Sequence, residues 1–175
     1  MIYAFFALLF LVLGLLLWRD HGPRPKLPKP APVSPKRHRR KAPPRREILV
    51  DGSNVMWWDG DTPKLETLVT VVSRLKAEGF TPGVIFDASA GHRLFGRYRD
   101  DAYMAAALGL PAEQVLVVPK GEVADRFLLM TARDRKLRVV TNDRYRDWLE
   151  EFPEAKGRLV QGGFQGGILW LDPLI

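Results

Sequence analysis

Short apolar runs alternate with helical patterns from residue 47 to the end of the chain, and this alternation constrains the fold more than any other feature. Strands that alternate with helices form parallel sheets covered by helices on both faces. The sequence therefore predicts an α/β domain over residues 47–175, a three-layer α/β/α sandwich with a mainly parallel central sheet. Strands are predicted at 48–50, 83–87, 115–118 and 137–141, with one or two closing strands within 158–160 and 167–171, and helices at 63–78, 98–108, 123–136 and about 143–151.

Several classes of site are excluded by residues that the chain lacks. No Gly-x-Gly-x-x-Gly follows the first predicted strand, and no Gly-x-x-x-x-Gly-Lys-Ser/Thr motif occurs. Rossmann and P-loop sites depend on these loops, so we expect no nucleotide cofactor. The absence of cysteine excludes disulfides and thiolate zinc sites. His92 is the only histidine of residues 47–175, which leaves a histidine metal site or a Ser-His-Asp triad without support.

The first eighteen residues carry no charged side chain and predict a transmembrane anchor at residues 1–18. As a helix they would span about 27 Å, just short of a hydrocarbon core, and Trp18 and Arg19 can sit at the interface. A cleaved signal peptide is the alternative. It usually has basic residues before the apolar run and a small-residue cleavage site after it, and neither is found here.

Residues 19–46 predict a stiff basic linker between this anchor and the domain. They contain eleven Lys or Arg against one acid, and eight of the fourteen prolines. Such a segment buries too little apolar surface to fold, and proline favours an extended backbone. Positive charge beside an apolar span favours the cytoplasmic side. We therefore expect a single-pass protein of a bacterial-type inner (cytoplasmic) membrane, with its C-terminal domain in the cytoplasm. The linker is expected mainly to contact anionic lipid, with RNA binding as the alternative.

Four aspartates lie where predicted strands end or predicted helices begin. Asp51 follows the first strand, Asp125 opens the helix at 123–136, and Asp143 and Asp147 follow the fourth strand at helical spacing, so that they would share one helical face. Open α/β sheets bind ligands at the carboxyl ends of their strands. Clustered carboxylates need a counter-charge, and hard oxygen ligands select Mg²⁺ or Mn²⁺. Each acid alone could be a helix cap or a first-turn acid. The set predicts metal-assisted phosphate chemistry.

Three segments that carry these acids resemble one known family. They are Ile-Leu-Val-Asp-Gly-Ser-Asn-Val (48–55), Ala-Asp-Arg-Phe-Leu-Leu (124–129) and Val-Val-Thr-Asn-Asp-Arg-Tyr-Arg-Asp-Trp (139–148). In order and spacing they are similar to the NYN domains of Regnase-like ribonucleases, within the PIN-like nuclease superfamily. The resemblance covers roughly residues 47–155. The first and last segments are fairly specific in combination, and the middle one is not.

The resemblance implies a Mg²⁺-dependent endoribonuclease and assigns roles to particular residues. It implies that Asp51, Asp125, Asp143 and Asp147 hold the metal, that Asn54 assists them, and that Asp143 or Asp147 orients the attacking water. PIN-like domains often pair, so a homodimer is also implied. This chain departs from the family at Ala124, where some members have a second acid before the helix. It also lacks the cysteines of the CCCH zinc finger found in animal members, which makes it resemble a bacterial membrane-anchored form.

Basic and aromatic side chains near the acids are candidates for RNA contacts. For the arginines the alternative is a solvated surface or charge balance. Trp57 and Trp58 can stack on bases, but packing against the first helix is favoured. Asp87 ends the second strand and is either a further site acid or a loop acid. The candidate phosphate contacts are Arg93, Arg97, Arg99, Arg144 and Arg146.

Three functions remain open from the sequence. The favoured one is a membrane-tethered, metal-dependent endoribonuclease that hydrolyses phosphodiester bonds in single-stranded or structured RNA. The second is a catalytically weak or inactive RNA-binding module on the same fold, for which Ala124 is the main support. The third is another metal phosphohydrolase, such as a phosphatase or a DNA-directed flap nuclease. A phosphatase of the aspartyl-phosphate type would need a second acid two residues after Asp51, and Ser53 stands there.

Overall fold

The structure is a computed structural model, and it describes residues 46–174. The predicted anchor at 1–18 and all but the last residue of the predicted linker at 19–46 lie outside these residues. Within 46–174, no helix combines the length and the apolar character needed to cross a membrane.

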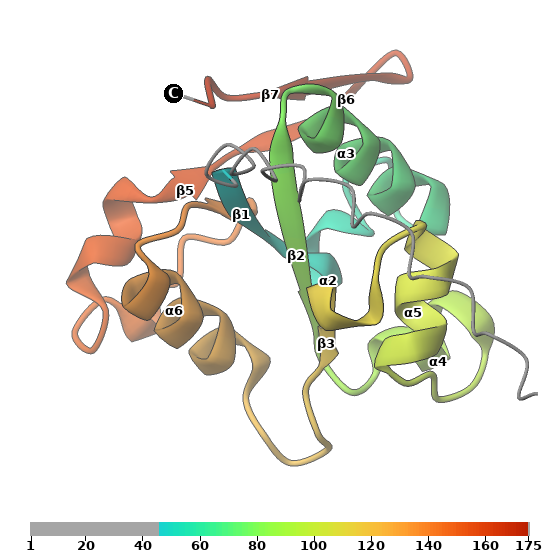
Figure 1. Cartoon of the computed structure of the whole chain (residues 1–175), viewed down its shortest axis with the longest axis horizontal. Coiled ribbons are helices and arrows are strands. Elements are labelled where there is room, and N and C mark those ends of the chain that lie inside the picture. The colour runs from blue at the N-terminus through green and yellow to red at the C-terminus, as the bar shows by residue number, and fades with distance from the viewer. Residues whose placement is uncertain (1–45, 175) are drawn as a thin grey trace, which may run out of the picture. The chain divides into compact units, whose positions relative to one another are not determined.

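Five parallel strands form the central sheet in the spatial order β3-β2-β1-β4-β5 (Figure 1). The last residue of β1, Asp51, pairs with Ile85 of β2, and Val50 pairs with Val140 of β4. The carboxyl ends of these three strands therefore lie together, as the parallel arrangement predicted. The strands are β1 (Arg46–Asp51), β2 (Phe80–Phe86), β3 (Val115–Val117), β4 (Val139–Val140) and β5 (Leu159–Val160).

Helices cover both faces of the sheet, with α3, α4 and α5 on one face and α6 on the other (Figure 1). The helices are α2 (Gly52–Val55), α3 (Leu65–Ala77), α4 (Ala90–Phe95), α5 (Asp101–Leu108) and α6 (Ala124–Arg135). Residues 46–174 also contain three short 3₁₀ helices: η1 (Ala112–Gln114), η2 (Arg146–Trp148) and η3 (Pro153–Gly157). The predicted α/β fold, a mainly parallel sheet flanked by helices, is confirmed.

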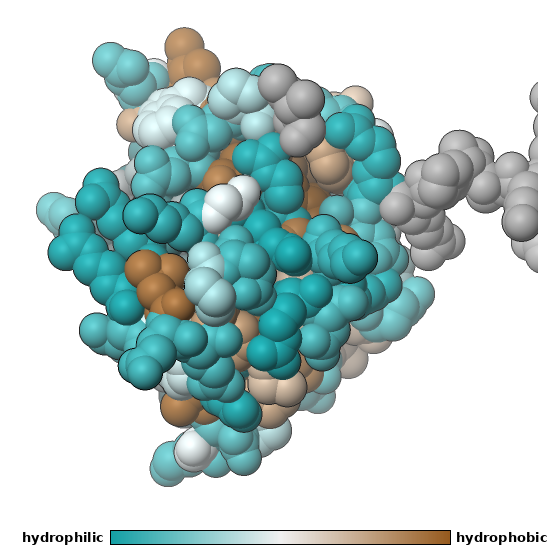
Figure 2. All heavy atoms as spheres, turned by 90° about the vertical axis from the view of Figure 1, so that its left-hand side faces the viewer, coloured by the Kyte–Doolittle hydropathy of each residue, from teal (hydrophilic) through white to brown (hydrophobic). Residues whose placement is uncertain are grey.

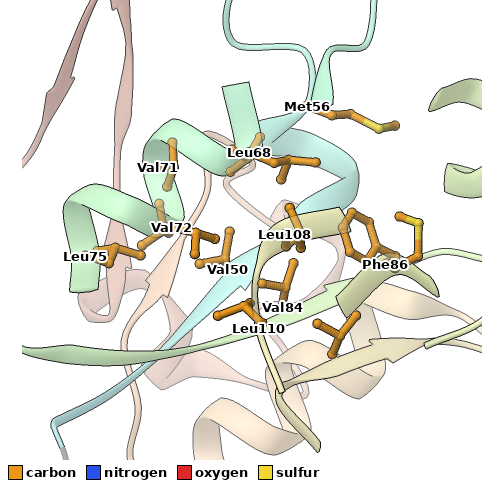
Figure 3. Packing of buried hydrophobic residues seen from close by; sticks show 14 of the residues in the cluster. Val50, Met56, Leu68, Val71, Val72, Leu75, Val84, Phe86, Leu108 and Leu110 are labelled. Carbon is orange, nitrogen blue, oxygen red and sulfur yellow. The ribbon is translucent and has the colours of Figure 1, made fainter. Parts of the chain in front are cut away.

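Alternate residues of each strand divide the apolar core into two clusters. On β1, Ile48 and Val50 face α3 and α5, whereas Leu49 faces α6. Such alternation is the period of two expected of a strand that is buried on both faces. The larger cluster fills the space below α3 and α5, where Val50, Val84 and Phe86 meet side chains of the two helices (Figure 3).

An antiparallel hairpin ends the domain and forms a separate two-stranded sheet. It consists of β6 (Gly162–Gln165) and β7 (Ile168–Leu171). Leu169 and Leu171 pack against the larger core cluster, which fixes the hairpin to the domain. The predicted closing strand at 167–171 corresponds to β7.

The predicted helix at 143–151 is wrong. Only Arg146–Trp148 form a helical turn, the 3₁₀ helix η2. Tyr145 has a left-handed backbone, with φ of 47°, and the Asp143 Oδ1 accepts a hydrogen bond from the Tyr145 N at 2.7 Å. An Asx turn of this kind competes with a helix for the same backbone groups. Asp143 and Asp147 therefore do not share a helical face.

Two short helices have no counterpart in the predicted pattern. The segment after β1 forms the helix α2, and the segment that carries Arg93 forms the helix α4. The helix predicted at 98–108 is present as α5 but starts at Asp101. The Asp100 side chain caps it there by accepting a hydrogen bond from the Tyr103 N at 2.9 Å.

The molecular face on the side of α6 and β5 is largely hydrophilic, with hydrophobic residues only in small separate patches (Figure 2). Scattered apolar residues of this kind are normal on a protein surface and do not mark an interface.

Candidate active site at the carboxyl edge of the sheet

Asp51 is the most enclosed acid of the edge, with 9% of its surface exposed. Its Oδ1 accepts from the Asn54 N at 3.1 Å, which caps α2. Its Oδ2 accepts from the Tyr145 hydroxyl at 2.6 Å and from the Thr141 hydroxyl at 3.0 Å. Burial raises the pKa of Asp51, the three hydrogen bonds oppose that rise, and the charge of Asp125 adds to it. The hydrogen bonds thus hold this carboxyl group in one orientation, while burial and the charge of Asp125 disfavour its ionised form.

Gly52, the first residue of α2, lies against the ring of Phe86. A Cβ at this position would lie 2.3 Å from the ring of Phe86, which is fully buried. Only glycine fits without moving that ring. Phe86 therefore packs directly beneath the turn that carries Asp51.

Asn54 connects the turn after β1 to the loop after β4. Its Oδ1 accepts from the Trp58 Nε1 at 2.8 Å and from the Asn142 N at 2.9 Å. Because both partners are N–H donors, the oxygen of the amide must face them. The Asn54 Nδ2 has no protein partner among residues 46–174. An open hollow beside the acids is lined by Asn54, Asn142, Asp143, Arg144, Arg146 and Asp147.

Asn142 in turn ties this loop to the terminal hairpin. Its Nδ2 donates to the Gly162 O at 2.8 Å, and its Oδ1 accepts from the Gly162 N at 3.1 Å. The loop that presents Asp143 is thus held on one side by Asn54 and on the other by β6.

Asp125 stands in the first turn of α6 and is half-buried. Its pKa is raised, first by burial and then by the negative charges of Asp143 and Asp87, while a hydrogen bond from the Trp148 side chain opposes the rise. Because Asp125 also raises the pKa of Asp51, these four aspartates act on one another across the edge.

Asp87 belongs to this edge. Its backbone N donates to the Ser53 Oγ at 2.9 Å, and its Oδ1 accepts from the Ser89 N at 2.6 Å. Burial alone would raise the pKa of Asp87, but hydrogen bonds from Ser89 and Ser53 and the charge of Arg93 outweigh it, so the pKa is lowered. Asp87 is therefore ionised more readily than an ordinary aspartate.

Asp143 and Asp147 differ from Asp51 and Asp125 in being exposed to solvent. Asp143 is positioned by its backbone N, which donates to the Thr141 Oγ1 at 3.0 Å. Asp147 lies in η2 and lines the hollow together with Asp143. The structure thus brings Asp51, Asp125 and Asp143 within electrostatic reach of one another and leaves Asp147 at their border.

The arginines occupy different positions around the edge. Arg144 and Arg146 are exposed and line the hollow. The Arg93 Nε donates to the Ser89 Oγ at 3.0 Å, and its guanidinium lies 5.7 Å from the centre of the Trp57 ring. Arg97 is exposed and follows α4.

Arg99 and Trp58 serve the packing of the domain. The Arg99 guanidinium lies 3.7 Å from the centre of the Tyr103 ring and is only partly exposed. Trp58 packs against the larger core cluster, as favoured from the sequence, whereas Trp57 remains 36% exposed. Ala124 is half-buried and packs against the α6 side of the core.

Sequence patterns did not reveal four polar residues that position the acids. Thr141 and Tyr145 hold Asp51, Asn142 holds Asn54, and Ser53 holds Asp87. Thr141 and Asn142 stand directly after β4, at the carboxyl end of a strand, where a site residue is expected. Their position could therefore have identified them from the sequence. The contact of Tyr145 depends on its left-handed backbone, and nothing in the local sequence indicates that.

The donor chemistry of the edge fits a divalent cation, although no preformed cage is present. Among the described residues, no three carboxylate or histidine side chains gather closely enough to hold an ion by themselves. Mg²⁺ commonly binds through one or two carboxylates and keeps several waters. Asp51 and Asp125, whose pKa values are both raised, offer the negative charge that such an ion neutralises.

A parallel sheet with aspartates gathered at the carboxyl ends of its strands defines a class of α/β proteins suited to phosphate chemistry. The family model of the Zc3h12a-like ribonuclease NYN domain matches residues 44–169. The chain belongs to this family, as the resemblance in the sequence predicted. Membership supports an RNA-cleaving nuclease function.

Solved structures share the fold. Two structures of the nuclear protein-only RNase P 2 (PRORP2) of Arabidopsis thaliana align with TM-scores of 0.58 and 0.56, at 22% and 21% sequence identity. The alignments cover 74% and 73% of this chain but only 30% and 29% of the plant chains. No curated protein matches this chain in sequence.

Proposed function

We propose that this chain is a metal-dependent endoribonuclease with its catalytic centre at the carboxyl edge of the sheet. The observation that carries the proposal is the gathering of negative charge at this edge: Asp125 raises the pKa of Asp51, and Asp143 and Asp87 raise the pKa of Asp125. Repulsive carboxylates of this kind destabilise a domain unless a cation binds between them. Acids with perturbed pKa values beside an open hollow are typical of catalytic sites.

Asp51, Asp125 and Asp143 would hold Mg²⁺, with Mn²⁺ as a substitute. When bound, the ion would stabilise the charge that builds on a phosphodiester and lower the pKa of a water. Tyr145 and Thr141 keep the Asp51 carboxyl group in one orientation by donating to its Oδ2. Such supporting hydrogen bonds usually matter nearly as much as the ligands themselves.

The hollow beside the acids supplies groups that can bind the RNA backbone and the attacking water. Asp147 or Asp143 would orient the water. The Asn54 Nδ2 is a hydrogen-bond donor on the wall of the hollow, and Arg144 and Arg146 provide positive charge for phosphate oxygens. Arg93 and Arg97 extend this positive charge on the side of α4.

The location of the domain is part of the proposal. Residues 1–18 would anchor the chain in a bacterial-type inner membrane, and residues 19–46 would keep the nuclease in the cytoplasm near the lipid surface. Cleavage would then act on RNA near that membrane. A homodimer is proposed on family resemblance alone. Recovery of the full-length chain in the soluble fraction after cell lysis would contradict the anchor.

The test is cleavage of labelled single-stranded and duplex RNA by the full-length chain with Mg²⁺, with Mn²⁺ and with EDTA. A variant that carries both Asp51→Asn and Asp143→Asn serves as the comparison, and circular dichroism checks that it is folded. We expect cutting that depends on the metal and is lost in the variant. Cutting that survives in EDTA, or equally in the variant, would overturn the acidic site.

A second candidate function is an RNA-binding module without catalysis. It is favoured by Ala124, which replaces an acid found in some relatives, and by the lack of a preformed cage among residues 46–174. In the same assay this function predicts RNA binding with no cleavage by the folded wild-type chain in either metal. Restoring the acid by Ala124→Asp should then produce cleavage.

A further inference from the structure

A second pocket lies beside the acidic edge, away from the hollow that carries Asn54 and Asp147. It is formed by the segment after β2, by α4, by the loop between α4 and α5, and by the loop after β3. The residues that line it are Ala88, Ser89, His92, Tyr98 and Lys120. The proposed chemistry uses none of these side chains.

Ser89 connects this pocket to the acids. Its backbone N donates to the Asp87 Oδ1 at 2.6 Å, and its Oγ accepts from the Arg93 Nε at 3.0 Å. The charge of Asp87 reaches Asp125. A ligand in the pocket would therefore lie next to the proposed catalytic centre.

Tyr98 is the most exposed aromatic residue of the described chain, with 56% of its surface open to solvent. Within residues 46–174 it has no hydrogen bond, ring contact or cation partner. Tyr103, also exposed, differs in that Arg99 lies over its ring at 3.7 Å and the Phe95 ring meets it edge-on at 5.2 Å. The ring of Tyr98 is thus free to stack on a ligand.

The other groups of the pocket suit a nucleotide better than an apolar ligand. Lys120 can pair with a phosphate, and His92 and Ser89 can hydrogen-bond to a base or a sugar. Single-stranded nucleic acids are bound by aromatic rings that stack on bases and by cations that follow the backbone. In a duplex the bases are already stacked on one another and cannot reach such a ring.

We propose that the pocket lined by Tyr98, His92 and Lys120 binds one unstacked nucleotide of single-stranded RNA next to the acidic edge. The inference rests on the proposed nuclease function and adds the means by which its substrate is selected. RNA would then be cut at a fixed distance from a base held on Tyr98, and paired RNA would be disfavoured.

The test is the affinity of the full-length chain for fluorescein-labelled single-stranded RNA of about ten nucleotides, measured by anisotropy in EDTA so that the RNA stays intact. A duplex of the same length is the second probe. For single-stranded RNA, Tyr98→Ala should weaken binding about tenfold, whereas Tyr98→Phe should keep it within about twofold, because the ring remains. For Lys120→Ala, the dependence of log affinity on log salt should become shallower by about 0.7, the value of one lost phosphate contact.

Two controls on surfaces away from the edge separate this effect from general losses. Trp170→Ala removes an aromatic residue of β7 that is 47% exposed, and Lys76→Ala removes a lysine beside the amino end of β2. Both should bind like the wild-type chain. The basic linker is present in every variant, so its contribution cancels.

Wild-type affinity of Tyr98→Ala for single-stranded RNA would overturn the proposal, and the exposed ring would then be assigned to a protein contact. An equal loss on the duplex would overturn selection of single strands. Cleavage with Mg²⁺ is measured separately on the same proteins. Absence of cleavage by the wild-type chain would count against the nuclease, whereas the binding data alone decide the nucleotide pocket.

Discussion

At the amino ends of the strands, Glu47 pairs with Arg135 at 2.6 Å. At the carboxyl ends, Asp125 instead acts through its charge on Asp51, and Asp143 acts through its charge on Asp125. None of the ion pairs within residues 46–174 includes these three aspartates. The first arrangement is the usual exposed salt bridge. The second concentrates like charges and lowers the stability of the domain. This difference supports the proposal that the carboxyl edge binds a ligand, at some cost in folding stability.

If the two edges differ in function, removing one negative charge should affect the rate of RNA cleavage at the carboxyl edge and not at the amino edge. We expect Asp51→Asn to reduce RNA cleavage by about a thousandfold, the scale of losing one preorganised electrostatic group. Glu47→Gln at the amino edge should cleave like the wild-type chain. Initial rates in Mg²⁺ on one labelled RNA measure both, and comparable losses in the two variants would contradict the difference between the edges.

Packing beneath the site can be tested with two glycines. Gly52→Ala places a methyl group against the buried Phe86 ring and should destabilise the domain by about 1–3 kcal/mol, the usual result of overpacking. Gly157→Ala is the matched control, since nothing lies within 4 Å of its added Cβ. Urea unfolding followed by circular dichroism gives both values. Equal stability of the two variants would show that the ring moves aside freely.

Support of Asp51 by Tyr145 should be visible in the pH dependence of cleavage. Tyr145→Phe removes a hydrogen bond that lowers the pKa of Asp51. We expect cleavage to fall about tenfold and the acidic limb of the rate profile to move to higher pH. Tyr103→Phe, which deletes the hydroxyl of an exposed tyrosine, should change neither. A uniform drop without movement of the limb would leave Tyr145 a purely structural role.

The cost of the repulsive acids should appear as a pH-dependent gain in stability. The folded pKa of Asp125 is raised, so its carboxylate costs stability as the pH rises from about 4, its unfolded pKa, through the folded value. Asp125→Asn should therefore stabilise the metal-free domain by about 1 kcal/mol at neutral pH and by nothing below pH about 4.

Thermal unfolding in EDTA measures this effect of Asp125→Asn. Added Mg²⁺ should raise the Tm of the wild-type chain more than that of the variant. A variant that is less stable than the wild type in EDTA at neutral pH would show that the repulsion is not what limits this edge.

The smallest effect is expected at the amino edge. The Glu47–Arg135 pair is solvent-exposed, and such pairs contribute about 0–1 kcal/mol. Glu47→Gln should therefore lower the stability by less than about 1 kcal/mol at low salt and by less still at high salt. A larger loss of stability would mean that the Glu47–Arg135 pair contributes more than an ordinary surface ion pair.

The central sheet and the long helices could be predicted because their residues carry a clear period. Strands such as β1 and β2 are apolar on both faces, and α3 repeats apolar residues at helical spacing. The short helices α2 and α4 were missed, since four to six residues are too few to show a period. The helix expected at 143–151 failed because the Asp143 side chain closes a turn on the Tyr145 N instead.

The candidate site could be predicted in part for a related reason. Asp51 and Asp143 follow strands directly, and their positions along a parallel sheet suffice to place them at one edge. Asp147 was predicted to stand on the same helical face as Asp143, and it does not, because the backbone turns at Tyr145. Two of the three hydrogen bonds that hold Asp51 join residues about ninety positions apart, and no local pattern reveals such contacts.

The Asn142 side chain donates one hydrogen bond to the Gly162 backbone and accepts another from it, as a peptide group of a neighbouring strand would. These two bonds join the loop that carries Asp143 to the C-terminal hairpin. The C-terminal hairpin therefore helps to position the loop that carries Asp143. Proteolytic trimming before β6 would release the loop that presents Asp143 without removing any of the aspartates at the carboxyl edge. Hydrogen exchange at the Asp143 amide would then quicken, because the loop would lose its attachment to the hairpin.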